Sequence, residues 1–206
     1  MKPSTKIMVA HEAALLLYYG LEKEYLQAKR RATRSLNVKI LPSNRDVAEE
    51  LDSIAEELEG QERQRRLIRL RTDALGLMQS LRQFSPRLIG SVWRGTATRN
   101  SDIDIRVFSD DRGPVERAFV DSGYVIQRKV KRLKQDPISG RVNTYHHIYL
   151  KLSGGVEAEI VVHRCSDPED AGVCAIYGDL ITGLGVEGLS KVMMEDPLKK
   201  FVPNNR

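Results

Sequence analysis

The chain has 206 residues, with 33 Lys and Arg, 28 Asp and Glu, and a formal net charge of +5 at pH 7. This length suits one average domain with an appendage, and the charge falls short of the clustered basicity of a dedicated nucleic-acid binder. The two cysteines, Cys165 and Cys174, form no CxxC pair, which argues against a disulfide framework or a zinc site. The apolar run at 13–21 is too short for a membrane span and follows His11 and Glu12, so we expect a soluble cytoplasmic protein.

Three helices are expected before any strand. Apolar residues spaced by threes and fours predict a first helix over 7–34, and its basic end suits a helix C-terminus electrostatically. The second helix begins at a capping box formed by Ser43 and Asp46, and it ends near Gly60. A third helix over about 61–83 follows directly.

The next segment combines a Gly-Ser turn with an alternating acidic strand. Gly90 lets the backbone approach a ligand closely, and N–H groups at such a turn before a helix suit an anion. Asp102 and Asp104 follow Ser91 at a distance of about eleven residues, and both project to the same side of the predicted strand. Two neighbouring carboxylates repel each other unless a cation lies between them. The pattern therefore predicts a hard divalent ion, in the first place Mg2+.

The remaining elements predict a small mixed sheet with helices on one side, in an α+β fold. A short helix is expected over 113–120, followed by two strands over about 124–135 and 141–152 that are joined by a hairpin turn at 136–140. A last strand is expected over 155–162.

A basic cluster at 128–134 carries five charges in seven residues on the first of these two strands. We favour a solvated edge strand, on which lysines are common, over a ridge that tracks an RNA backbone or clamps a triphosphate. The histidines at 11, 146, 147 and 163 are expected to be structural, although His163 follows the acidic strand closely enough to line a site.

The Gly-Ser turn, the Asp-x-Asp strand and a later strand with Glu157 and Glu159 resemble, in this order, the DNA polymerase β-like nucleotidyltransferase superfamily. The local sequence is similar to archaeal CCA-adding tRNA nucleotidyltransferases in particular, without their C-terminal domains. The similar segments are Gly-Ser-Val-x-Arg-Gly-Thr and Gly-Val-Glu-x-acid-Ile-Val. The resemblance covers about 86–163 and departs from the usual pattern by a Glu as third acid. It implies a catalytic palm in which Asp102 and Asp104 bind two Mg2+ ions, or Mn2+, and a third carboxylate completes the metal site. An acid followed directly by apolar residues favours Glu159 over Glu157.

The resemblance also implies a reaction. The enzyme would move a nucleoside monophosphate from an NTP, in the first place ATP, to a hydroxyl on an RNA end, a protein or a small molecule, with release of pyrophosphate. Gly90 and Ser91 would hold the β and γ phosphates, and Arg94 would neutralise a phosphate or simply be exposed. Trp93 is expected to pack beside the turn rather than to stack on a base.

A second interpretation is a catalytically weak NTP-sensing or partner-binding protein of the same fold, in which the N-terminal helices mediate self-association or partner binding. In either case three parts are expected: an N-terminal helical segment at 1–60, the nucleotidyltransferase domain at 61–165, and a C-terminal helical tail at 166–206 that packs against the palm.

Overall fold

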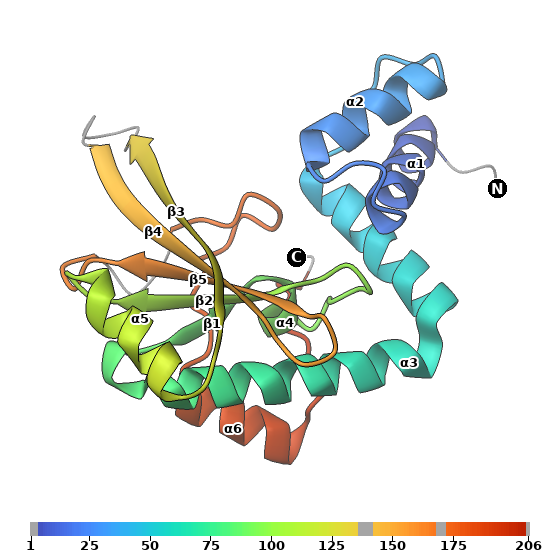
Figure 1. Ribbon diagram of the computed structural model, residues 1–206. Coiled ribbons are helices and arrows are strands. Elements are labelled where there is room, and N and C mark those ends of the chain that lie inside the picture. Colours follow the sequence, from blue (N-terminus) through green and yellow to red (C-terminus); the bar gives the residue numbers. More distant parts are fainter. Residues whose placement is uncertain (1–3, 136–141, 168–171, 205–206) are drawn as a thin grey trace.

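The computed structural model describes residues 4–135, 142–167 and 172–204. In Figure 1 a helical lobe stands beside a lobe built on a sheet, and one long helix, α3, runs through both. The helical lobe is formed by α1 (Thr5–Tyr18), α2 (Tyr25–Ser35) and the first part of α3 (Asn44–Ser80). It has its own hydrophobic core, separate from the core of the sheet lobe.

The single first helix predicted over 7–34 is wrong, because the chain turns between α1 and α2. Gly20 adopts a φ of 68°, and the backbone N–H groups of Leu21 and Glu22 both bond to the carbonyl of Leu16. The apolar spacing continues across this turn, so periodicity alone does not reveal the break.

The helix boundary predicted at Gly60 is confirmed as a kink inside α3. Gly60 has a φ of 50° and a ψ of −128°, which are not helical, although helix flanks it on both sides. The capping box of Ser43 and Asp46 is present at the start of α3. The kink separates the part of α3 in the helical lobe from the part that packs under the sheet (Figure 1).

The predicted mixed sheet is confirmed. Its strand order is β1-β2-β5-β4-β3, in which β2 and β5 are parallel and the other neighbours are antiparallel. The strands are β1 (Arg87–Ile89), β2 (Ile103–Phe108), β3 (Ile126–Gln135), β4 (Val142–Lys151) and β5 (Glu157–His163). The hairpin turn predicted at 136–140 lies outside the described residues.

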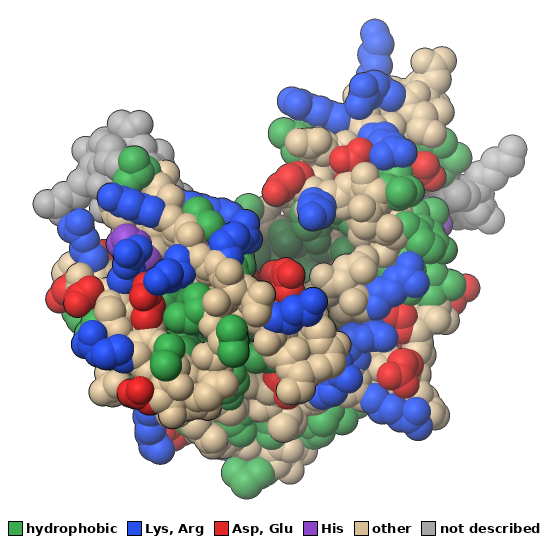
Figure 2. All heavy atoms as spheres, in the orientation of Figure 1, with side chains coloured by type: hydrophobic (Ala, Val, Ile, Leu, Met, Phe, Trp, Pro, Cys, Tyr) green, Lys and Arg blue, Asp and Glu red, His purple; other side chains and the backbone are tan. Residues whose placement is uncertain are grey.

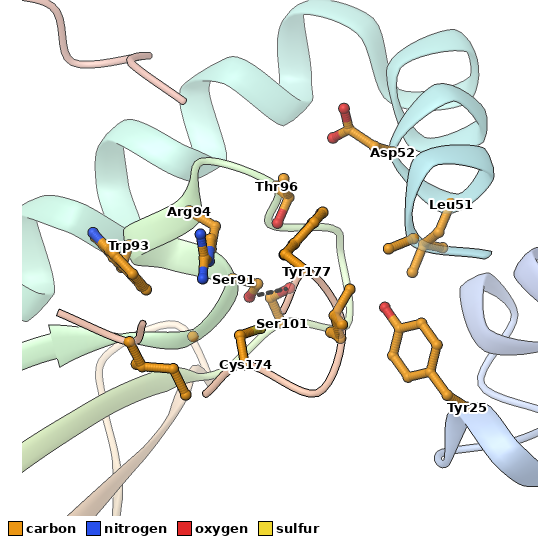
Figure 3. Close-up of a pocket in the computed structure, with 14 residues that line it drawn as sticks. Tyr25, Leu51, Asp52, Ser91, Trp93, Arg94, Thr96, Ser101, Cys174 and Tyr177 are labelled. Carbon is orange, nitrogen blue, oxygen red and sulfur yellow. Dashed lines mark hydrogen bonds between the residues drawn. The ribbon is translucent and has the colours of Figure 1, made fainter. Parts of the chain in front are cut away.

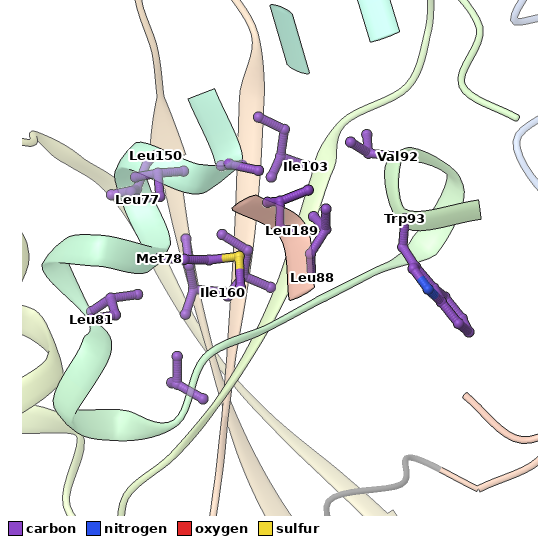
Figure 4. Packing of buried hydrophobic residues seen from close by; sticks show 14 of the residues in the cluster. Leu77, Met78, Leu81, Leu88, Val92, Trp93, Ile103, Leu150, Ile160 and Leu189 are labelled. Carbon is purple, nitrogen blue, oxygen red and sulfur yellow. The ribbon is translucent and has the colours of Figure 1, made fainter. Parts of the chain in front are cut away.

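Among the described elements, helices cover one face of this sheet and leave the other open (Figure 1). The short helix predicted over 113–120 is confirmed as α5 (Arg112–Asp121), and a 3-10 turn (Arg82–Phe84) and α4 (Gly90–Arg94) flank β1. The second part of α3 packs beneath the strands, where Leu77 and Met78 meet Ile103 and Ile160 in the core (Figure 4).

Within the described part of the C-terminal tail, the expected helix is restricted to α6 (Val186–Glu195), which packs against α3. The described stretch before it, 172–185, contains turns and isolated bridges instead. Its glycines at 178 and 183 have positive φ values, which interrupt regular structure. Among the helices that the structure describes, none is long and apolar enough to span a bilayer.

Candidate metal centre and adjoining cavities

Three carboxylates meet on the open face of the sheet. Asp104 of β2 is paired in register with Glu159 of β5, and Asp102 lies directly before β2. Each of the three residues offers a ligand oxygen, and these oxygens all lie within 4.8 Å of one another. The structure thus brings together the three acids proposed from the sequence, and their role as metal ligands stays a prediction.

The electrostatics of this acidic trio suit a cation. Burial raises the pKa of Asp104 to about 8, and the negative charges of Asp102 and Glu159 add to the effect. The pKa of Asp102 is also raised, first by burial and then by Glu159 and Glu157. A hard divalent ion with oxygen ligands would remove this repulsion, so the donor set fits Mg2+ or Mn2+.

Glu159 differs from the two aspartates because two side chains of β4 contact it. The Tyr149 hydroxyl donates a hydrogen bond of 2.6 Å to Oε1, and Nδ1 of His147 lies 2.5 Å from the same oxygen. Burial alone would raise the pKa of Glu159, but these two contacts outweigh it and lower the pKa. The two contacts thereby hold the carboxylate of Glu159 in a fixed orientation.

The sequence did not indicate that His147 and Tyr149 belong to this site, since the pattern predicted a structural role for His147 and none for Tyr149. Tyr149 is paired with Glu159 across β4 and β5, and His147 shares its face by the two-residue alternation of a strand. Both residues lie in the strand predicted at 141–152, and Glu159 lies in the strand predicted at 155–162. Their contact could be predicted only with the register between these two strands.

Glu157, the other candidate for the third acid, lies at the start of β5, opposite Lys151. Its side chain is exposed and lines the cleft beside Asp102, outside the group of oxygens that lie within 4.8 Å of one another. The geometry therefore favours Glu159 as the third ligand.

Gly90 lies against the acidic trio. It has a φ of 71°, and a Cβ at this position would come within 2.1 Å of Asp104 Oδ2, so a side chain is excluded. The Ser91 hydroxyl donates to Ser101 Oγ at 3.0 Å, and the same Oγ accepts the backbone N–H of Thr98 at 2.9 Å. The Gly-Ser turn is therefore fixed next to the carboxylates, as a phosphate-holding role requires.

The surroundings of Arg94 favour a structural role over the phosphate contact considered from the sequence. Its guanidinium is buried and donates to both carboxylate oxygens of Asp179, at 2.8 and 2.7 Å, and to the Phe201 carbonyl at 2.7 Å. Trp93 packs beside the turn as expected, with its ring stacked on Phe201 at a centroid distance of 6.4 Å.

Two adjoining cavities lie between the helical lobe and the sheet lobe, where Figure 2 shows the molecule hollowed. The larger, of about 820 Å3, is lined by Asp102 and Glu157 and by basic side chains, including Arg69 and Arg99. The smaller, of about 180 Å3, is mainly apolar and is shown in Figure 3. Both cavities share the lining residues Tyr25, Leu51 and Ser101.

Comparison with known proteins finds a family to which part of the chain is similar. Residues 79–162 match the family model of the nucleotidyltransferase domain, which confirms the resemblance to nucleotidyltransferases. A solved structure described as a cytoplasmic RNA terminal U-transferase is 19% identical and has a TM-score of 0.33; the match covers 56% of this chain and 35% of that one. This chain thus spans about a third of that protein's length. Among curated proteins, no relative matches the chain.

Proposed function

We propose that this protein is an Mg2+-dependent enzyme that transfers a nucleoside monophosphate from an NTP, in the first place ATP, to a hydroxyl acceptor. The match of residues 79–162 to the family model of the nucleotidyltransferase domain supports this proposal. The observation that carries the proposal is the trio of Asp102, Asp104 and Glu159, whose ligand oxygens lie within 4.8 Å of one another beside Gly90. A structural role does not require three carboxylates on the open face of a sheet, where they repel one another.

In this reaction the hydroxyl oxygen of the acceptor bonds to the α-phosphorus, the bond from that phosphorus to the bridging oxygen breaks, and pyrophosphate leaves. The hydroxyl proton passes to a carboxylate of the trio. Bound Mg2+ would neutralise the phosphate charge and lower the pKa of the hydroxyl. Catalysis of this kind depends on positioning and on charge neutralisation rather than on a protein nucleophile.

Different residues of this chain would have different roles in the reaction. Asp102, Asp104 and Glu159 would hold the metal, and Tyr149 and His147 keep Glu159 oriented. Gly90 leaves room for a substrate to approach the carboxylates, and Ser91 at the adjoining turn would contact the β and γ phosphates.

The test is to incubate the protein with each radiolabelled NTP, Mg2+ and a cell extract, and to ask which molecule becomes labelled. We expect transfer of label from an α-labelled NTP, and Asp104→Asn should abolish it. Calorimetry that detects no Mg2+ or Mn2+ binding, even with a nonhydrolysable NTP, would contradict the proposal. Tight Mg-NTP binding without transfer would instead support the NTP-sensing alternative.

A further inference from the structure

The smaller cavity lies where three distant parts of the chain meet. The helical lobe contributes Tyr25 and Leu51, the segment after β1 contributes Ser91 and Trp93, and the C-terminal stretch contributes Ile176 and Tyr177. In Figure 3 the side chains of Tyr25 and Leu51 face Tyr177 and Ser91 across the cavity. The lining is thus mainly aromatic and apolar, with hydroxyl groups at a few points, as is typical of pockets for small organic ligands. Its two charged side chains are paired with other residues, Asp52 with Lys200 and Arg94 with Asp179.

The size and position of this cavity suit one end of a nucleotide. Its volume is about 180 Å3, below the roughly 300–1,000 Å3 of pockets that enclose a whole ligand. Gly90 and Ser91, which adjoin the acidic trio, form part of its wall, and the larger cavity, which Asp102 lines, adjoins it through three shared lining residues. A molecule with its phosphates at the Gly-Ser turn can therefore place its other end here.

Tyr25 and Tyr177 add polar groups to this apolar wall. Among the described residues, neither hydroxyl takes part in a hydrogen bond. Burial raises the pKa of both side chains, so the hydroxyls stay protonated and can donate. Aromatic rings that carry free donors suit a flat heterocycle that has acceptor atoms at its edge.

We propose that this cavity binds the nucleobase of the NTP, with Tyr25 and Tyr177 contacting the base while the triphosphate lies at the Gly-Ser turn. The inference rests on the proposed function and extends it to residues outside 79–162, the range that matches the nucleotidyltransferase domain. It gives the helical lobe and the C-terminal stretch a role in substrate binding. Contacts between a base and an aromatic ring can form with any base, because every base has a π-face.

The test compares two ligands that share the phosphates and differ in the base. The protein is titrated by calorimetry in Mg2+ with a nonhydrolysable ATP analogue and, separately, with inorganic tripolyphosphate. Tyr25→Leu should weaken binding of the analogue by about tenfold or more and leave tripolyphosphate binding unchanged. Trp93, the only tryptophan of the chain, lines the cavity. Its fluorescence should change with the analogue and not with tripolyphosphate.

Tyr19→Leu is the matched control, because Tyr19 lies in the same lobe, is exposed, and does not line the cavity. It should leave both affinities at the wild-type values. Tyr25→Phe keeps the ring and should retain more affinity than Tyr25→Leu, which guards against a variant that fails to fold.

Each other outcome is decisive. If Tyr25→Leu weakens both ligands equally, or neither, the base does not occupy this cavity and the inference falls while the proposed function stands. If wild-type protein binds tripolyphosphate as tightly as the analogue, the base again does not occupy this cavity, and the proposed function still stands. If it binds neither ligand, the proposed function falls as well.

Discussion

The hydroxyl of Tyr149 donates a hydrogen bond of 2.6 Å to Oε1 of Glu159, the acid that completes the trio. His147 Nδ1 lies 2.5 Å from the same oxygen. Replacing a group that holds a metal ligand in place typically lowers metal affinity or activity by about 10- to 100-fold. Arg132 donates to the Tyr149 hydroxyl at 3.2 Å, and the Arg128 guanidinium lies 4.0 Å from the Tyr149 ring centroid, so the orienting group is itself held in place.

We therefore expect Tyr149→Phe to lower Mn2+ affinity by about 10- to 100-fold while the fold is retained. Tyr145→Phe is the control, since Tyr145 lies on the same strand and face and its ring packs against His163 at 4.7 Å. Calorimetric titration with Mn2+ measures both variants. Equal affinities of Tyr149→Phe and wild-type protein would show that this hydrogen bond does not organise the metal site.

The two acids of β5 should differ in their effect on activity. Glu159→Gln keeps the size of the side chain but removes the charge that a metal requires, so we expect loss of metal binding and of nucleotide transfer. Glu157→Gln should leave most of both, because Glu157 is exposed and lies outside the trio. Nucleotide transfer and Mn2+ titration of the two variants decide the point. If only Glu157→Gln abolishes activity, the metal site has to be placed two residues earlier on the strand.

Without metal, the stability of the protein should depend on pH through Asp104. Its pKa in the folded protein is about 8, against about 4 in an unfolded chain. Between these values the native state binds the extra proton, so the free energy of unfolding falls as pH rises. Below about pH 6.5 His163 opposes this trend, since burial, with help from Arg106, lowers its pKa to about 4 in the folded protein. The clearest window is therefore roughly pH 6.5 to 8.

In EDTA we expect the melting temperature of the wild-type protein to fall across that window, and Asp104→Asn to flatten the profile. Mg2+ should stabilise the wild-type protein more at the upper end of the window than at the lower, because only the ionised trio binds it and binding to the native state stabilises by mass action. A wild-type profile in EDTA that is as flat as that of Asp104→Asn would show that Asp104 is ionised without metal.

The acidic centre was predictable from the sequence because its signals are local. The two-residue spacing of Asp102 and Asp104 places both on one face of any strand, and the Gly-Ser turn precedes them directly. The choice of Glu159 rested on a pattern of neighbouring residues, and the pairing of Glu159 with Asp104 agrees with it.

The parts that escaped prediction depend on contacts between distant segments. His147 and Tyr149 reach Glu159 only through the register of β4 against β5, and a shift of one residue would turn both side chains to the other face. The wall shared by Tyr25 and Tyr177 arises from the packing of the helical lobe against the C-terminal stretch, which no periodicity encodes. The break at Gly20 was more predictable, because a glycine inside a helical pattern disfavours a continuous helix.

Arg94 should matter to stability more than to nucleotide binding. Its guanidinium is buried and is committed to Asp179 and to the Phe201 carbonyl. Arg94→Met would remove the charged donor from both acceptors, and we expect it to lower the free energy of unfolding by about 3 kcal/mol or more. Urea denaturation measures this, and Arg65→Met on the exposed surface of α3 should change it by less than about 0.5 kcal/mol. If Arg94→Met is stable but binds NTP poorly, the result would support the hypothesis, considered from the sequence, that Arg94 contacts a phosphate.

The basic strand β3 presents its charges on two different faces. Arg128 and Arg132 contact Tyr149 beside the acidic trio, whereas Lys129 pairs with Glu116 of α5 at 3.0 Å on the helix-covered side. By the alternation of a strand, Lys131 shares the face of Lys129.

Replacing Lys129 and Lys131 by Gln should leave any affinity for nucleic acid alone and increase self-association, because β3 is an edge strand and loses two charges that discourage pairing. Analytical ultracentrifugation and the salt dependence of binding to a single-stranded RNA measure the two effects. The comparison is the Arg128→Gln, Arg132→Gln pair, which keeps the lysines and changes only the face beside the trio. Each lost phosphate contact flattens the log-log salt slope by about 0.7 for a single strand. A flattened slope in the lysine pair would show that the edge binds nucleic acid rather than merely keeping the protein soluble.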